Sequence, residues 1–436
     1  MRSWIRVGMA ALALLVTTTA HAQFHGYAAA SYGYHSNPLY NYERIPDQVH
    51  QGFLELQYTH VTGTGTLSAG YTGGLMIFNT FTDRNYLEHA LRVGYGHAYG
   101  TVGAAERQPA VAPAAEDQEE GTEETAGEET EEEAAPIDPD SVRTFLDLQL
   151  RGSARHDKDA FREFDNTGLA LATVVRFPLG AWYLRVMDDL GMRSYSSLAE
   201  LSNVTEHATV QFGRIIGRSV TIGAALAGGA KYYTSDMIDT SAYQTSVTTT
   251  GKGNGNGNAN GKAKGVSKKV LSNTTTTTAW QIAGGVFGGF TWEQGMVSVT
   301  GWYRYNPGKG TRYLAQYANT SMLDEDIYND FFSYEGPEVK LVMRQELPLQ
   351  LQATVSGGWA RRQFSASALE LDQTDTGKKR RDVISDIEIG ISRFFPVSEG
   401  SGIDLALTTA AMRNQSNDAY NDHGLWQAGL SLGIGF

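Results

Sequence analysis

Charged and polar side chains occupy every second position within several apolar segments of this chain, and this spacing is the feature closest to chemistry. Over residues 142–155, Leu146, Leu148 and Leu150 alternate with Asp147 and Arg151. A repeat of two residues is that of a β-strand, so such a strand has one apolar face and one charged face. Charged side chains that line a water-filled space attract or repel ions. The pattern therefore predicts strands that separate an apolar environment from a hydrated one.

The same alternation recurs in 335–346, 349–363, 382–395 and 402–413, and single charges occupy comparable positions elsewhere. An interior with this many charges excludes a dry soluble core, where unpaired ions are costly. Two interpretations stay open: rings of charge that set the selectivity of a pore, or opposite charges that pair across an occluded barrel. The candidate lumen-facing residues are eight bases and seven acids, namely Glu55, Glu88, Arg92, Asp147, Arg151, Arg185, Lys231, Arg304, Glu338, Lys340, Arg344, Arg362, Asp386, Glu388 and Asp404.

Strands of suitable length must hold these side chains, and the period-two pattern predicts sixteen of them. Sixteen is an even number, as in single-chain bacterial barrels, and a count of fourteen to eighteen is compatible with the pattern. The fold class is therefore all-β, a transmembrane antiparallel up-and-down β-barrel. The predicted strands are 24–34, 50–61, 65–78, 85–99, 142–155, 166–177, 181–193, 204–214, 218–233, 279–292, 296–305, 335–346, 349–363, 382–395, 402–413 and 424–436.

The connections between these strands alternate in length. Tight turns follow most even-numbered strands, whereas longer loops follow odd-numbered ones, at 35–49, 234–278, 306–334 and 364–381. Short periplasmic turns and long external loops are typical of outer-membrane barrels. A sixteen-strand barrel generally encloses an aqueous channel. The asymmetry therefore favours a barrel that spans a membrane.

The last predicted strand, Gly424 to Phe436, alternates most regularly. Its apolar parity is the predicted assembly signal, and it ends on the aromatic terminal residue: Trp426, Leu430, Leu432, Ile434 and Phe436. This ending resembles the final strand of Gram-negative outer-membrane β-barrel proteins, a porin-like class, with no match to a specific family. The resemblance implies a place in the bacterial outer membrane and recognition by the barrel-assembly machinery.

Three segments lie outside the strand pattern. Residues 1–22 have a positive start, an apolar run and an Ala20-His21-Ala22 site, which predict a signal peptide, so that 23–436 form a single barrel. Residues 101–140 hold 14 acids and one base, a net charge of −13 (1 minus 14), and predict an acidic disordered insertion, on the periplasmic side by strand parity. Residues 245–278, rich in Gly, Asn, Lys and Thr, predict a long flexible basic loop that is extracellular.

No distinctive catalytic or metal-binding motif accompanies these patterns. The histidines are scattered without a His-Glu-x-x-His arrangement, and the acidic loop 322–330 lacks the spacing of a calcium loop. The sequence therefore predicts no enzyme activity, no cofactor and no metal. It also contains no cysteine, so no disulfide holds the barrel together.

The predicted function is a porin-like channel for small hydrophilic solutes. The alternative is a non-conducting barrel that serves surface interaction or envelope assembly. Expected partners are outer-membrane lipids and lipopolysaccharide, the barrel-assembly machinery and small hydrophilic solutes, with no nucleic acid and with a homo-oligomer as a further option.

Overall fold

A computed structural model of the chain describes residues 22–38, 45–62, 65–99, 144–158, 162, 164–235, 278–307, 331–371, 374–398 and 400–436. The predicted signal peptide up to residue 21, the acidic insertion 101–140, the loop 322–330 and nearly all of 245–278 lie outside these residues. Among the described residues, no helix has the length and apolar character to cross a membrane.

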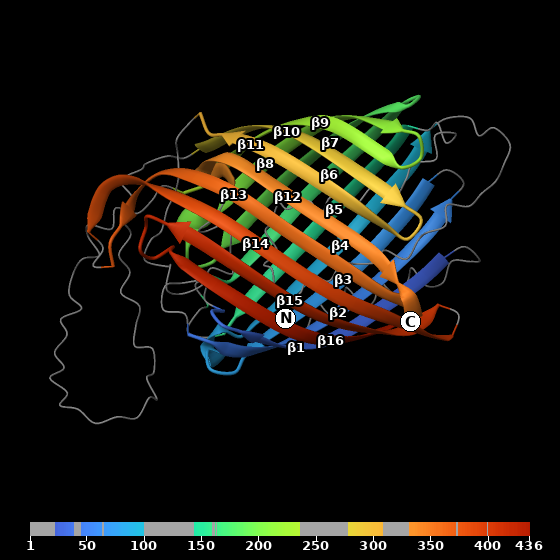
Figure 1. The fold of residues 1–436 in the computed structure, drawn as a ribbon, viewed down its shortest axis with the longest axis horizontal. Coiled ribbons are helices and arrows are strands. Elements are labelled where there is room, and N and C mark those ends of the chain that lie inside the picture. Colours follow the sequence, from blue (N-terminus) through green and yellow to red (C-terminus); the bar gives the residue numbers. More distant parts are fainter. Residues whose placement is uncertain are drawn as a thin grey trace.

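Sixteen strands close into one barrel, in which each strand pairs with its neighbours in the chain and β1 pairs with β16. Every pairing is antiparallel, so the fold is the predicted up-and-down barrel (Figure 1). The strands are β1 (Ala22–His35), β2 (Asp47–Thr62), β3 (Gly65–Phe78), β4 (Tyr86–Tyr99), β5 (Thr144–Asp157), β6 (Asn166–Leu179), β7 (Trp182–Tyr195), β8 (Asn203–Ile216), β9 (Val220–Tyr233), β10 (Thr278–Trp292), β11 (Gly295–Tyr305), β12 (Tyr334–Leu347), β13 (Leu351–Leu369), β14 (Asp375–Ser398), β15 (Ser401–Ser416) and β16 (His423–Gly435).

The period-two alternation of the sequence becomes the two faces of the barrel wall. In most strands the large exposed apolar side chains share one parity, as Leu405 and Leu407 do on β15. That parity is the outer face, and the other parity points into the lumen. Tryptophan and tyrosine occur near both ends of the outer face, for example Trp182 and Trp280.

The two rims of the barrel differ. At one rim, called the turn rim, strands join through short connections such as residues 180–181, 217–219 and 293–294. At the other, called the loop rim, three short 3-10 helices accompany the longer connections: η1 (Thr82–Arg84), η3 (Ala199–Leu201) and η6 (Phe331–Ser333). β4 ends and β5 begins at the turn rim, where Tyr99 pairs with Thr144.

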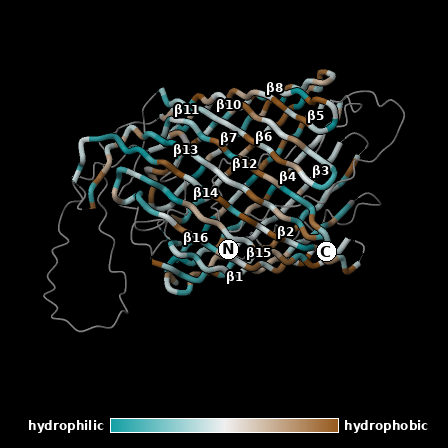
Figure 2. Tube along the Cα trace, viewed as in Figure 1, coloured by the Kyte–Doolittle hydropathy of each residue, from teal (hydrophilic) through white to brown (hydrophobic). Residues whose placement is uncertain are grey.

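One predicted loop, between the thirteenth and fourteenth strands, is wrong, because most of its residues belong to strands. Residues 364–381 were expected to form a long loop, but β13 and β14 continue through most of them and leave only 370–374 as the connection. The extended ends project from the loop rim, at the left of Figure 1, and Figure 2 shows them as largely hydrophilic. Their residues lack the apolar alternation of the barrel wall, because beyond that wall no outer face needs to be apolar.

Candidate functional site

All fifteen charged residues predicted to face the lumen lie on the inward parity of their strands. In the register, Arg92 is opposite Arg151, and Glu388 is opposite the polar Ser356. Most of the outward positions beside them are apolar, as with Leu91, which is 58% exposed. A shared inward face is necessary for a pore lining, and their role in conduction stays a prediction.

The inward face of β4 to β7 carries six arginines and four acids, an excess of bases for which it is called the basic wall. Arg92 stands directly opposite Arg151, and Arg176 stands directly opposite Arg185. Like charges at directly opposed positions repel one another, and the neighbouring acids Glu55 and Asp189 offset part of this repulsion. Neither Arg151 nor Arg185 forms an ion pair with a residue that the structure describes.

Sequence reasoning missed several inward charges on these strands. Their parity follows from that of neighbouring residues, so the alternation itself was the signal that could have found them. Arg176, for example, has the opposite parity to Leu169 and Leu171 on β6. The missed inward residues are Arg155, Asp157, Arg176, Asp189 and Arg193.

The inward face of β14 and β15 forms an acidic wall. It carries Asp386 and Glu388 on β14 and Asp404 on β15. The carboxylate of Asp386 lies over Gly358 of β13, since a Cβ at Gly358 would be 2.5 Å from Asp386 Oδ1. In the strand order, β14 and β15 are about half a circumference away from β5 and β6. The basic wall and the acidic wall therefore face each other across the barrel.

One ion pair on the basic wall bridges three strands. Arg92 Nη2 donates to Glu55 Oε1 at 2.8 Å, and Glu55 is only 5% exposed. The arginine reaches it across β3 over Gly70, where a Cβ would be 2.8 Å from Arg92 Nε. A glycine is needed there because any side chain would occupy the path of the guanidinium. Glu55 and Arg92 thus neutralise each other.

A second cluster joins β10 to β13 close to the loop rim. Arg304 donates to Glu338 Oε2 at 3.0 Å and to Gln281 Oε1 at 2.9 Å. Tyr334 donates its hydroxyl to the other oxygen of Glu338, and the Arg362 guanidinium lies 4.4 Å from the centre of the Tyr334 ring. Three of the predicted pore-lining charges are consequently engaged with one another, so here the pairing interpretation applies.

The connections at the loop rim fold onto this inward face. The ring of Phe332 is 1% exposed and lies beside the inward-facing Gly229, where a Cβ would be 3.2 Å from its Cζ. Asn306 donates to the Phe332 carbonyl at 2.8 Å, which ties the connection to the Gln281 cluster. Leu198 and Leu201 are likewise buried, at 2% and 4% exposed. Phe332 is therefore packed against the inward face of the wall at the loop rim.

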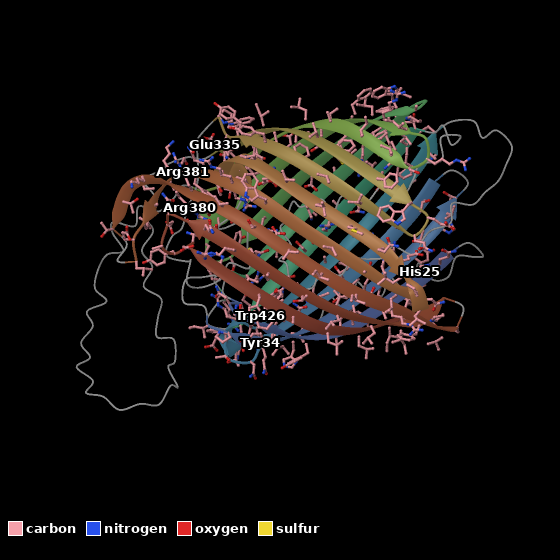
Figure 3. All side chains as sticks on the ribbon, in the orientation of Figure 1. His25, Tyr34, Glu335, Arg380, Arg381 and Trp426 are labelled. Carbon is pink, nitrogen blue, oxygen red and sulfur yellow. The ribbon has the colours of Figure 1, made fainter. Side chains whose placement is uncertain are left out.

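A buried polar cluster anchors the extended β13–β14 hairpin. Arg380 forms a bidentate ion pair with Asp382, both 0% exposed, and the guanidinium lies 4.0 Å from the centre of the Phe364 ring. Ser416 of β15 donates to Asp382 at 2.6 Å. Asp418, also buried, accepts from the Leu369 backbone at 3.0 Å. Figure 3 shows Arg380 and Arg381 at the start of the projecting segment.

The residues of the predicted assembly signal all lie on the outer face of β16. Trp426, Leu430, Leu432 and Ile434 are each 51% exposed, and Phe436 is 52% exposed. Trp426 meets Tyr34 of β1 at 5.1 Å between ring centres (Figure 3). At the turn rim, the backbones of Phe436 and Gly26 exchange two hydrogen bonds of 2.7 and 2.8 Å. These contacts form the seam that closes the barrel.

The part of the chain that the structure describes holds no group of three or more His, Asp or Glu residues arranged to bind a metal ion. The candidate oxygen ligands of the acidic loop, Asp324, Glu325, Asp326 and Asp330, lie outside the described residues.

No protein-family model matches this chain, and no curated protein matches it. Among solved structures, it is similar to OpdK from Pseudomonas aeruginosa, crystallised with vanillate, at 9% identity and a TM-score of 0.42, over 95% of this chain and 98% of that one. It is similar to OccAB3 from Acinetobacter baumannii at 9% identity and a TM-score of 0.44, over 95% and 99% of the two chains. It is also similar to OccK9 (OpdG) from Pseudomonas aeruginosa at 10% identity and a TM-score of 0.44, over 95% and 98%.

Proposed function

We propose that this chain is a porin-like channel of the bacterial outer membrane that passes small hydrophilic solutes. The observation that carries the proposal is the opposition of a basic wall on β4 to β7 and an acidic wall on β14 and β15 inside a closed sixteen-strand barrel. Charged walls that face each other across a barrel favour water between them, because the interior of a dry protein holds so many charged side chains only at a high cost in free energy. Water between the walls is the path of the solute.

The outer face supports a membrane location. Large apolar side chains are exposed around the wall, among them Val286 at 65% and Leu226 at 60%. Soluble proteins rarely expose so extensive an apolar surface, whereas a bilayer covers it. A barrel also satisfies every backbone hydrogen bond without a free edge, as the hydrocarbon region requires.

Strand parity gives the barrel an orientation. The turn rim faces the periplasm and the loop rim faces outward, so the acidic insertion 101–140 projects into the periplasm and the basic loop 245–278 faces lipopolysaccharide phosphates. β16 carries the signal for the barrel-assembly machinery. The chain performs no enzymatic reaction in this account.

The two walls create a field across the lumen, and we expect their charges to tune ion selectivity. Arg151, Arg176 and Arg185 attract anions, whereas Asp386, Glu388 and Asp404 attract cations. A unit charge about 8 Å from the ion's path contributes roughly 0.5 kcal/mol at the dielectric constant of water, which is about a twofold change in the permeability ratio.

The alternative is a non-conducting barrel that serves surface interaction or envelope assembly. The Arg304–Glu338 cluster and the buried Phe332 favour it, since both occupy the inward face near the loop rim. The reversal potential across a bilayer with unequal salt on its two sides separates the two functions.

We expect the triple variant R151Q/R176Q/R185Q to shift the reversal potential toward cation preference, by about twofold in permeability for each charge removed. The triple variant D386N/E388Q/D404N shifts it toward anions. The matched control is R393Q, which removes an arginine from the outer face of β14 at the turn rim and leaves the reversal potential unchanged. Equal reversal potentials in all four proteins would contradict a pathway between these walls.

A further inference from the structure

Four polar side chains point outward from the barrel wall, two from the middle of their strands and two from the fourth residue below the loop rim. They are Tyr71 on β3, His89 on β4, Asp188 on β7 and Glu206 on β8. Their parity follows from the register. His89 lies two residues from the outward Leu91, and Glu206 is opposite the outward Leu190, which is 45% exposed. Asp188 has the parity of Leu190 and Met192 on the same strand.

The first two of these side chains form a hydrogen-bonded pair. Tyr71 Oη and His89 Nδ1 are 2.7 Å apart. The tyrosine reaches the histidine by lying over Gly73, the direct partner of His89 in the register, where a Cβ would be 2.7 Å from Tyr71 Oη. The pair presents an imidazole and a phenol, which can donate hydrogen bonds, to the surroundings of the barrel.

The other two side chains form an acidic pair on the β7–β8 hairpin. Asp188 is opposite Ala208, and Glu206 is opposite Leu190, so the two carboxylates are diagonal neighbours on adjacent strands. Both accept hydrogen bonds when ionised. A charge that faces lipid near the midplane is unfavourable, with acids costing less than the roughly 2–4 kcal/mol of a base. Asp188 lies at the middle of β7, which indicates that something other than lipid covers it, and Glu206 is its neighbour on the side of the loop rim.

The two pairs occupy equivalent positions of their hairpins. Gly65 is opposite His97 at the turn rim of β3–β4, and Trp182 is opposite Arg214 at the turn rim of β7–β8. Tyr71 is six residues above Gly65 and Asp188 is six above Trp182. His89 is eight residues above His97, and Glu206 is eight above Arg214. The donor pair and the acceptor pair therefore lie at the same height in the wall.

The rest of the outer face contrasts with this sector. In the central outward positions of β9 to β16, which the structure describes, there is no Asp, Glu, Lys, Arg or His; the wall there consists of residues such as Leu226, Val286, Leu341 and Ile389. Between the two pairs, β5 and β6 present the leucines Leu150 and Leu171. The sector from β3 to β8 thus combines an apolar centre with complementary polar flanks.

We propose that this sector is the contact between copies of the chain in a closed ring, in which the Tyr71–His89 pair of one copy faces the Asp188–Glu206 pair of the next. The pairs are complementary, lie at equal height and are four strands apart out of sixteen. A head-to-tail contact closes into a ring when the directions from one copy to its two neighbours differ by a suitable angle. This angle is about 60° for a ring of three copies and about 90° for a ring of four. Four strands of sixteen span about a quarter turn, which fits such small rings.

The absence of cysteine from the chain allows a direct test by cross-linking. L91C/A208C adds one cysteine beside each pair on the outer face and keeps all four polar groups. Within one copy these positions are four strands apart, about 19 Å at the usual strand spacing, which no disulfide bridges. Oxidation of isolated outer membranes is expected to give a reducible ladder that ends at three or four copies. The control pair V299C/L405C, on β11 and β15, is expected to stay monomeric.

Neutral substitutions of the two acids provide the second part of the test. Adding D188N/E206Q to L91C/A208C is expected to reduce the cross-linked fraction severalfold, while heat-modifiable gel mobility shows that the barrel is folded. Cross-linking no stronger than in the control pair, or unaffected by D188N/E206Q, would overturn the ring. The proposal rests on the membrane location in the proposed function but not on conduction. A chain absent from the outer-membrane fraction would refute that location, whereas a conducting chain that does not cross-link would refute the ring alone.

Discussion

Removal of residues 423–436 is expected to abolish the folded barrel. β16 pairs with β1 over Tyr27 to His35 and with β15 over Gly402 to Asn414, so its loss leaves two long unpaired edges. In a bilayer each unsatisfied backbone group costs several kcal/mol, because no water replaces the lost hydrogen bond. We expect no heat-modifiable, protease-resistant form of the truncated chain in the outer-membrane fraction.

The control is a deletion of 101–140. This deletion removes a longer segment than 423–436 but no described strand. It is expected to leave heat modifiability and protease resistance intact. A truncated chain that still reaches the outer membrane in a heat-modifiable form would show that β1 and β15 can close the barrel without the terminal strand, and would remove the structural basis of the assembly signal.

The substitution D382A is expected to be the most destabilising single change at the loop rim. It removes the partner of Arg380, whose side chain is fully buried, and it deprives Ser416 of its acceptor. An arginine left buried without its carboxylate costs about 3–5 kcal/mol. Unfolding by guanidinium chloride of the protein in lipid vesicles is followed by tryptophan fluorescence. We expect the free energy of unfolding to be lower for D382A than for the unchanged protein by this amount.

Two further variants serve as comparisons for D382A. D422A breaks the half-exposed Arg413–Asp422 pair, whose side chains are 41% and 42% exposed, and is expected to cost less than about 1 kcal/mol because solvent screens it. R380M/D382L removes both buried charges and is expected to recover much of the loss. Equal unfolding curves for D382A and D422A would mean that the buried pair does not stabilise the extended hairpin.

The strand count and the inward face were predictable from the sequence, because alternation in a barrel wall is imposed by two different solvents. Every strand end lies within three residues of its predicted position, except the loop-side ends of β13 and β14. There the chain leaves the wall, so the apolar half of the alternation disappears, and the strands extend through hydrogen bonds to Asn417 and Asp418 of the neighbouring connection. Periodicity carries no information on such contacts.

The pairing of the inward charges could not be predicted, because it depends on the register between strands. Glu55 and Arg92 meet only because β3 places Gly70 between them, and Arg304 reaches Glu338 only because β11 and β12 align them. The outward Asp188 and Glu206 were missed for a related reason. Their segments were assigned an apolar outer face as a whole, and single departures from it are visible only once the parity of each strand is fixed by its neighbours.

These contacts distinguish two groups among nine of the fifteen predicted lumen charges. Glu55, Arg92, Arg304, Glu338 and Arg362 are engaged in ion pairs and hold neighbouring strands together. Arg151, Arg185, Lys340 and Asp404 form no ion pair with any described residue. The first group accounts for stability of the inner face, and the second is the group from which we expect selectivity.

Single-channel recording in a planar lipid bilayer tests the central claim most directly. The purified full-length protein, shown by heat-modifiable mobility to be folded, is expected to give stable conductance steps whose size rises with salt concentration, as in a water-filled pore. A folded protein that inserts but gives no steps would contradict the channel and leave the non-conducting barrel as the function of this chain.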